Sequence, residues 1–199
     1  MREISAAKIT ETVKKLCIEA NTFLPQDVKD RICSSCKAET WPLAQSILSI
    51  IKDNFETAAQ DNVPICQDTG VACVFIEMGQ EVHVDGNITD AVNEGVRQGY
   101  TEGYLRKSVV KDPLDRVNTN DNTPAMIYYN IVPGDKITVT VAPKGFGSEN
   151  MSQIKMLKPA DGLQGVKDFI LKVVEDAGPN PCPPCGNRCS STSLPFSIM

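Results

Sequence analysis

Cys66, Gln67, Asp68 and Thr69 stand side by side in the segment NVPICQDTGVACVF, residues 62–75, directly before an apolar run. A thiolate at Cys66 could ligate a soft metal, while the adjacent amide and carboxylate hold a polar substrate at the same metal. A polar turn that contains one buried thiol is the alternative interpretation. The segment therefore predicts a candidate metal and substrate site, and composition alone leaves both interpretations open.

Cationic groups that suit an anionic substrate occur in two later segments. YLRKSVVKDPLDR supplies Arg106, Lys107 and Arg116, and a guanidinium can hold a carboxylate through two parallel hydrogen bonds. A solvated basic face is the alternative. The loop KGFGSEN, residues 144–150, combines a lysine, backbone N–H groups and a hydroxyl, which together suit an anion. It is not a phosphate-binding P-loop, because its lysine precedes the glycines.

Eight cysteines allow a second kind of metal site. A four-cysteine zinc site can be drawn from two clusters of short spacing, Cys33 with Cys36 and Cys182 with Cys185 and Cys189. The first pair falls inside a helical pattern and lacks the tight turn of a zinc knuckle, so small apolar residues on a helix are the simpler interpretation. Reduced thiols in a chain without a secretory signal indicate a cytoplasmic protein.

Composition excludes several functional classes. The net charge of −5 and the pI near 5.0 argue against nucleic-acid binding, which needs clustered cations. No run approaches the eighteen apolar residues of a membrane span. His83 is the single histidine, and the alternation around it predicts an exposed strand position. Histidine-based catalysis is therefore not expected.

The hydrophobic pattern predicts an α/β (mixed α+β) fold, with a helical amino-terminal third followed by a mixed sheet flanked by helices. Cys17 and Cys73 are expected in the core. We expect one domain over residues 1–178 and an irregular tail over residues 179–199, without internal repeats. The expected helices span residues 5–20, follow Pro25, follow Pro42, and span 89–105 and 162–177, and the expected strands span 71–79, 81–85, 125–132 and 136–143.

Four segments occur together and in the order of one known family. PICQDTG, LRKSVVKDPLDRVNTNDNTPA, KGFGSENMSQIKML and AGPNPCPP resemble the amino-terminal (α) part of class I fumarate hydratases and L-tartrate dehydratases, the iron–sulfur hydro-lyases. The resemblance covers about residues 1–184. Four multi-residue matches in order are more specific than any one of them.

The resemblance implies a [4Fe–4S] cluster held by three cysteines, with one iron left open. The first two ligand positions fall on Cys66 and Cys182. The third has no matching position, because the sequence departs from the family after about residue 184. Either Cys185 or Cys189 substitutes for it, or the chain is a truncated or frame-shifted product that lacks the rest of the domain.

The resemblance also implies the substrate contacts. Gln67, Asp68 and Arg106 match positions that touch the dicarboxylate, with Asp68 and Arg106 as catalytic residues, and Gly147 lies in a loop that lines the same pocket. Fumarate and malate are the first substrates expected, and tartrate is the next.

Partners are implied as well. A β subunit or carboxy-terminal domain supplies the proton-transferring hydroxyl and further cations, within a homo- or hetero-oligomer. The alternative function is a non-catalytic metal-binding or regulatory remnant of the same fold.

Overall fold

The computed structural model describes residues 2–147 and 150–181. These residues form two compact units, divided between Lys144 and Gly145, and each unit is described by itself. The first unit contains two small sheets and four helices among its described residues. Its elements, in order, are β1 (Arg2–Ser5), α1 (Ala6–Thr22), α2 (Gln26–Ala38), α3 (Pro42–Asp61), β2 (Val71–Gly79), β3 (Val82–Asp85), α4 (Ile88–Glu102), β4 (Met126–Val132) and β5 (Ile137–Lys144).

Strand β2 is the centre of the main sheet, whose order is β4-β2-β5. Strand β4 runs parallel to β2 and β5 runs antiparallel to it, with Val74 opposite both Ile127 and Val141. The four-residue connection from Val132 to Ile137 therefore joins two strands that do not pair with each other. Strands β1 and β3 form a separate parallel pair.

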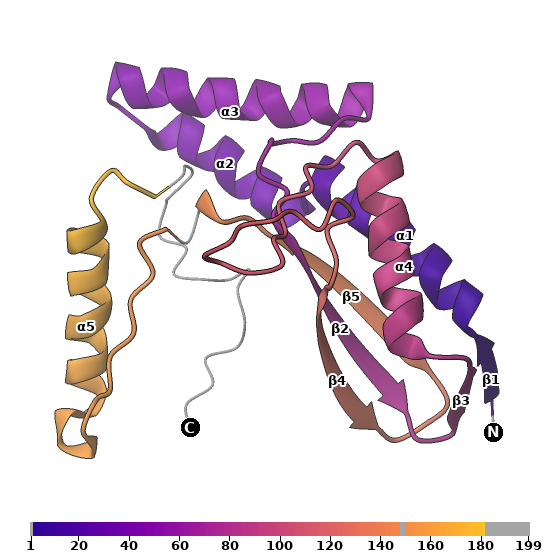
Figure 1. Cartoon of the computed structure of the whole chain (residues 1–199). Helices are drawn as coiled ribbons and strands as arrows, with labels where there is room; N and C mark the ends of the chain where they lie inside the picture. The colour runs from indigo at the N-terminus through magenta and orange to yellow at the C-terminus, as the bar shows by residue number, and fades with distance from the viewer. Residues whose placement is uncertain (1, 148–149, 182–199) are drawn as a thin grey trace. The chain divides into compact units, whose positions relative to one another are not determined.

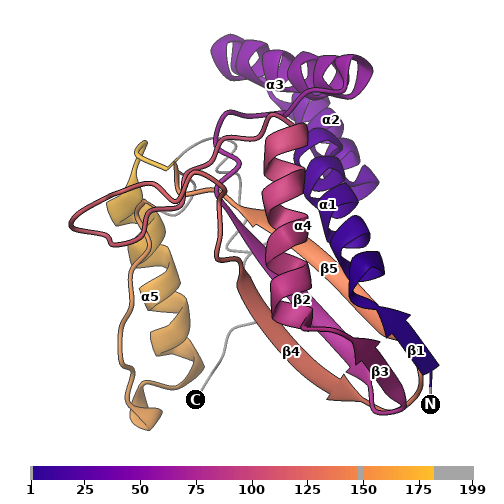
Figure 2. The same ribbon diagram turned by 45° about the vertical axis from the view of Figure 1, so that its right-hand side comes forward.

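Helices α1 and α4 pack side by side on one face of the main sheet (Figure 1, Figure 2). Their backbones approach closely because α4 carries glycine where the helices meet. A Cβ at Gly95 would lie 2.7 Å from the Thr10 carbonyl oxygen, and one at Gly99 would lie 2.9 Å from Cβ of Cys17. The buried core is Ile9, Val13, Cys17, Ala72, Val74, Ile76, Ala91, Val92, Val96, Tyr100 and Leu105.

Helices α2 and α3, which precede β2 in the chain, pack against each other. Helix α3 begins with Pro42 at its first turn, a position that needs no backbone N–H. It ends at Asp61 and is capped by Asn62 in the left-handed conformation with φ 55°. Leu43, Ile47 and Ile50 share one face of α3 and are exposed. The apolar pattern of this segment thus predicts the helix correctly, although these three residues lie outside the core.

The second unit contains a short 3-10 helix, η2 (Pro159–Asp161), and α5 (Gly162–Ala177) among its described residues. Gly178 ends α5 with φ 51°, as expected for a glycine after a helix. None of the helices in the described ranges has the length and apolar character needed to cross a bilayer. The tail predicted at residues 179–199 lies almost wholly outside the described residues, so the domain boundary near residue 178 stays a prediction.

The predicted mixed α/β class is confirmed. Cys17 and Cys73 are buried and His83 is exposed on β3, as predicted. The helix predicted for residues 89–105 is too long: α4 ends at Glu102, because Gly103 caps it and Tyr104 turns the chain with φ 54°. Strand β1 was not predicted.

Candidate active site

The segment from Val63 to Gly70 connects α3 to β2 and is fixed at both ends. At the first end, the Asn54 side chain donates to the Ile65 carbonyl at 2.9 Å, and the Ile65 N–H donates to the Asn21 carbonyl at 2.9 Å. At the other end, Gly70 turns the chain into β2 with φ 56°, a conformation that glycine adopts without strain. Cys66 is thereby presented at the surface on an anchored segment.

Cys66 and Gln67 line a pocket of about 310 Å³ together with Arg106. Pro64, Thr69 and Tyr104 complete the lining. Cys66, Gln67 and Arg106 are three of the site residues predicted from the sequence, and Arg106 comes from a segment about forty positions later. Asp68 is half-buried beside them, and its backbone N–H donates to Sγ of Cys66 at 3.4 Å.

Arg106 follows α4 in a short segment without regular secondary structure. Leu105 is buried in the core, and its N–H donates to the Tyr100 carbonyl at 3.0 Å. Tyr104, by contrast, is 90% exposed and adopts a left-handed φ of 54°, a conformation uncommon for residues other than glycine. Leu105 therefore anchors the segment, while Tyr104 and Arg106 on either side of it reach the pocket.

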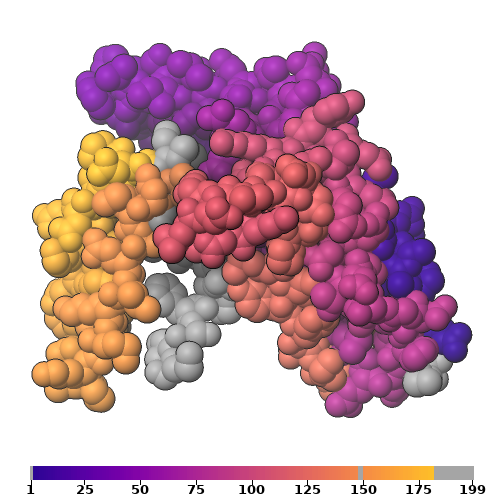
Figure 3. All heavy atoms as spheres, viewed as in Figure 1, coloured from indigo at the N-terminus to yellow at the C-terminus, as the bar shows by residue number. Residues whose placement is uncertain are grey.

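Residues 107–125 form a loop of the first unit whose side chains are exposed or half-buried, except for the buried Asn122 (Figure 3). Two other cations predicted as carboxylate contacts, Lys107 and Arg116, belong to this loop. Lys107 is half-buried and Arg116 is exposed, and neither lines the pocket. Of the three cations predicted as carboxylate contacts, only Arg106 therefore lines the pocket.

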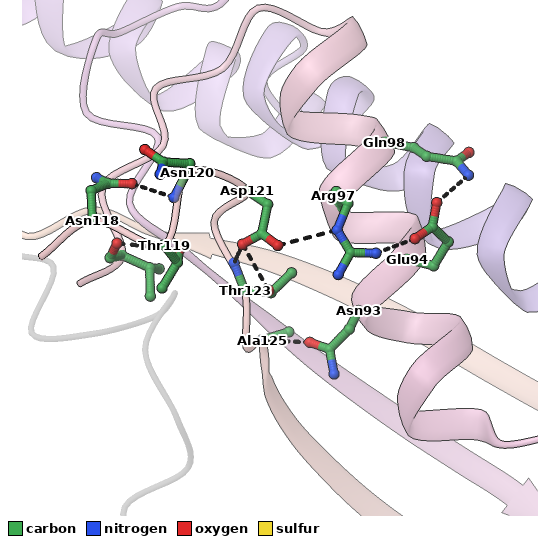
Figure 4. Close-up of polar contacts among 11 residues, drawn as sticks. Asn93, Glu94, Arg97, Gln98, Asn118, Thr119, Asn120, Asp121, Thr123 and Ala125 are labelled. Carbon is green, nitrogen blue, oxygen red and sulfur yellow. Dashed lines mark hydrogen bonds and ion pairs between the residues drawn. The ribbon is translucent and has the colours of Figure 1, made fainter. Parts of the chain in front are cut away.

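Helix α4 holds the end of that loop (Figure 4). Nε of Arg97 donates to Oδ2 of Asp121 at 3.1 Å, and Arg97 also pairs with Glu94 on its own helix. The Ala125 N–H donates to Oδ1 of Asn93 at 2.8 Å. Burial raises the pKa of Asp121, but hydrogen bonds from Thr123 and then Arg97 outweigh it and hold that pKa at about 2.

Cys66 has the chemistry of a cluster ligand. A thiolate is the ligand type that iron–sulfur clusters use, and the N–H of Asp68 is directed at its sulfur, a contact of the kind that tunes such clusters. Cys182, Cys185 and Cys189 lie outside the described residues. Over the ranges 2–147 and 150–181, no group of three potential metal-binding side chains is assembled. Among the described residues, Cys66 is thus the one candidate ligand for an iron–sulfur cluster at this pocket.

Two further predictions concern residues away from this pocket. Cys33 and Cys36 are half-buried on α2, as expected of small residues on a helix. Gly147 is half-buried in the second unit, and its place beside the substrate stays a prediction. Sequence reasoning missed Tyr104 as a pocket residue, although its position two residues before Arg106 was an available signal.

Comparison with known proteins extends over nearly the whole chain. Residues 10–186 match the family described as "Fumarate hydratase (Fumerase)". The chain is 38% identical over 184 residues to the "Putative L(+)-tartrate dehydratase subunit alpha" of Methanocaldococcus jannaschii, covering 89% of this chain and 64% of that protein. It is 30% identical over 181 residues to the L(+)-tartrate dehydratase subunit alpha of Escherichia coli strain UTI89, covering 89% of this chain. The chain spans 59% of the length of that second relative.

Proposed function

The chain belongs to the fumarate hydratase (Fumerase) family, and from this premise we propose that it is the α-type component of a hydro-lyase. The reaction adds water across the double bond of a small dicarboxylate, placing a hydroxyl on one carbon and a proton on its neighbour, or removes water in reverse. The observation that carries the proposal is the pocket in which Cys66, Gln67 and Arg106 meet.

Arg106 supplies the charge that this substrate needs. Its guanidinium presents two parallel N–H groups to one carboxylate. Neutralising that carboxylate also stabilises the carbanion-like charge that develops on the carbon beside it during elimination. The whole chain carries a net charge of −5, so an anion is attracted only by such a local cation.

Gln67 and Asp68 orient the substrate beside Cys66. The Gln67 amide both donates and accepts hydrogen bonds, so it suits a hydroxyl or a second carboxylate. Asp68 follows directly on the same anchored segment, where its backbone N–H already contacts the Cys66 sulfur. Gln67 lines the pocket and Asp68 is its neighbour in the chain, outside the lining. Together with Arg106 they suit a substrate that carries polar groups at both ends.

Cys66 and Cys182 would hold an iron–sulfur cluster, with the third thiolate still to be assigned. When bound, a [4Fe–4S] cluster with one open iron acts as a Lewis acid toward the substrate hydroxyl. The exposure of Cys66 at the pocket supports this role, because a metal that binds the substrate has to be held where the substrate can reach it.

The names of the relatives support a choice of substrate and partner, and they reverse the order of substrates expected from the sequence. Both relatives are named as subunit alpha of L(+)-tartrate dehydratase, so tartrate is the first substrate to test, and malate with fumarate is the second. A β-type subunit or domain completes the site in this proposal and supplies the proton-transferring group.

Anaerobic reconstitution of the full chain with iron and sulfide tests the proposal. We expect broad absorbance in the blue part of the visible spectrum, which is lost in Cys66→Ser and retained in Cys36→Ser, a matched change on α2. Absorbance that survives Cys66→Ser, or that never forms, would leave family membership standing and remove the proposed role of Cys66.

A further inference from the structure

The pocket is built from two segments that are distant in sequence. Residues 64–69 bring Cys66 and Gln67, and residues 104–106 bring Tyr104 and Arg106. The two segments share no secondary structure, since one precedes β2 and the other follows α4. Backbone hydrogen bonds anchor each segment separately, and side-chain hydrogen bonds join the two segments to each other.

Three buried side chains make those bonds, and we call Thr69, Tyr100 and Asn122 the clamp. The Thr69 hydroxyl donates to the Arg106 carbonyl at 3.0 Å, directly joining the two segments. The Tyr100 hydroxyl donates to the Thr69 carbonyl at 2.8 Å. Each of the three side chains is at most 2% exposed, so water does not compete for these contacts.

Asn122 is the member of the clamp that uses both ends of its side chain. Its Nδ2 donates to the Gly70 carbonyl at 3.0 Å, while Oδ1 accepts the N–H groups of Ser108 at 2.7 Å and Val109 at 3.1 Å. Its backbone adopts a left-handed φ of 62°, which asparagine tolerates better than most residues. The one side-chain amide thus holds Gly70, directly before β2, and the two residues that follow Lys107.

Helix α4 is the common frame for this arrangement. Tyr100 extends from the last turns of α4 to the Cys66 segment, whereas Arg97 and Asn93 hold Asp121 and Ala125 on either side of Asn122 (Figure 4). Asn122 is therefore itself anchored, which a side chain needs if it is to fix the position of others.

We propose that Asn122 is a positioning residue that sets the separation of Cys66 and Arg106, an inference that rests on the proposed function of that pocket. It acts through Gly70 and Ser108 and does not touch the substrate. Misplacement of a binding group by about 1 Å can cost about a hundredfold in rate, so this separation matters for a substrate held at both ends.

A crosslinking experiment on the full chain measures the separation without substrate or cluster. In an Arg106→Cys background, a short bismaleimide joins Cys66 to the thiol introduced at position 106, and peptide mass spectrometry quantifies that product. The substitution Asn122→Asp removes the donor to Gly70 and keeps the acceptor for Ser108 and Val109.

Asn93→Asp is the matched control. It removes the donor that Asn93 gives to the Thr89 carbonyl and keeps the acceptor for Ala125, without any contact to the Cys66 segment. We expect the crosslinked fraction of folded protein to fall about tenfold in Asn122→Asp, the equivalent of one lost buried hydrogen bond, and to stay unchanged in the control. Equal crosslinking in both variants would overturn the proposal.

Two further arms keep the result interpretable. Thr69→Val keeps nearly the same side-chain shape and breaks the direct hydrogen bond to the Arg106 carbonyl. If Asn122→Asp fails to fold, this variant is measured in its place, and we expect the same decrease in crosslinking. Calorimetric titration with tartrate, in chains that retain Arg106, then gives weaker binding in Asn122→Asp at temperatures where it remains folded. Absence of tartrate binding by the unmodified chain contradicts the proposed function, whereas unchanged crosslinking contradicts the role of Asn122.

Discussion

Tyr100→Phe removes one oxygen atom from the centre of the first unit. The hydroxyl of Tyr100 donates to the Thr69 carbonyl at 2.8 Å, and both residues are buried. Phenylalanine keeps the ring and its packing against the core, so the variant isolates the hydrogen bond. The carbonyl of Thr69 is left without this donor in a place that water does not reach.

The expected loss of unfolding free energy is about 1–3 kcal/mol, the cost of leaving a buried polar group unsatisfied. Tyr129→Phe is the matched control, because the Tyr129 hydroxyl also makes one hydrogen bond, at 2.9 Å to Oγ1 of Thr89, but Tyr129 is 47% exposed. Water replaces the lost partner there, so the change stays within about 0.5 kcal/mol.

Urea unfolding followed by circular dichroism measures both variants, and hydrogen exchange over β2 locates the effect. Burial also raises the pKa of Tyr100. The stability linked to this phenol is fully present below its unfolded pKa of about 10 and is lost as pH rises through the folded pKa. Tyr100→Phe has no phenol to ionise, so its unfolding free energy does not show this decrease at alkaline pH. Equal changes in Tyr100→Phe and Tyr129→Phe would refute the assignment of a buried, unreplaceable hydrogen bond.

Two other substitutions test the frame around the pocket. Gly95→Ala places a Cβ 2.7 Å from the Thr10 carbonyl oxygen, so overpacking of about 1–3 kcal/mol outweighs a gain in helix propensity of about 1 kcal/mol. We expect the thermal unfolding midpoint of Gly95→Ala to fall. A raised midpoint would show that α1 and α4 can move apart without cost. The pKa of Asp121 is about 2 because hydrogen bonds from Thr123 and Arg97 outweigh burial. The stability that this carboxylate contributes is present above the unfolded pKa of about 3.9 and is lost as pH falls toward 2. Acid titration of Asp121→Asn therefore shows a smaller loss of stability over that range than the unmodified chain, and identical losses would contradict the role of these hydrogen bonds.

Local patterns in the sequence predict most elements of the first unit. The burial of Cys17 and the strand of residues 71–79 follow from helical spacing and from a continuous apolar run. The pairing of the strands is harder to predict from the sequence. The short connection between β4 and β5 suggests that they pair with each other, whereas each of them pairs with β2. Strand β1 was missed since four residues carry too little pattern. Its partner β3 lies far along the chain.

The site was predictable to a different extent. Residue types suggested Cys66 and Arg106 as separate candidates, and only the resemblance to a family joined them in one pocket. The clamp was not foreseen, because a buried asparagine in NTNDNTP looks in sequence like any other polar turn residue. Its role depends on Gly70, fifty-two positions away, which a local pattern does not contain.

Calorimetric titration of the full chain with tartrate, and then with malate, tests most directly whether the pocket of Cys66, Gln67 and Arg106 binds a dicarboxylate. Arg106→Gln removes the guanidinium, and Lys111→Gln removes one exposed positive charge that does not line the pocket. We expect binding to weaken about 10- to 100-fold in Arg106→Gln, as for a lost charged hydrogen bond, and to remain within about twofold in Lys111→Gln. Equal affinities in the two variants, or no binding by the unmodified chain, would contradict the account.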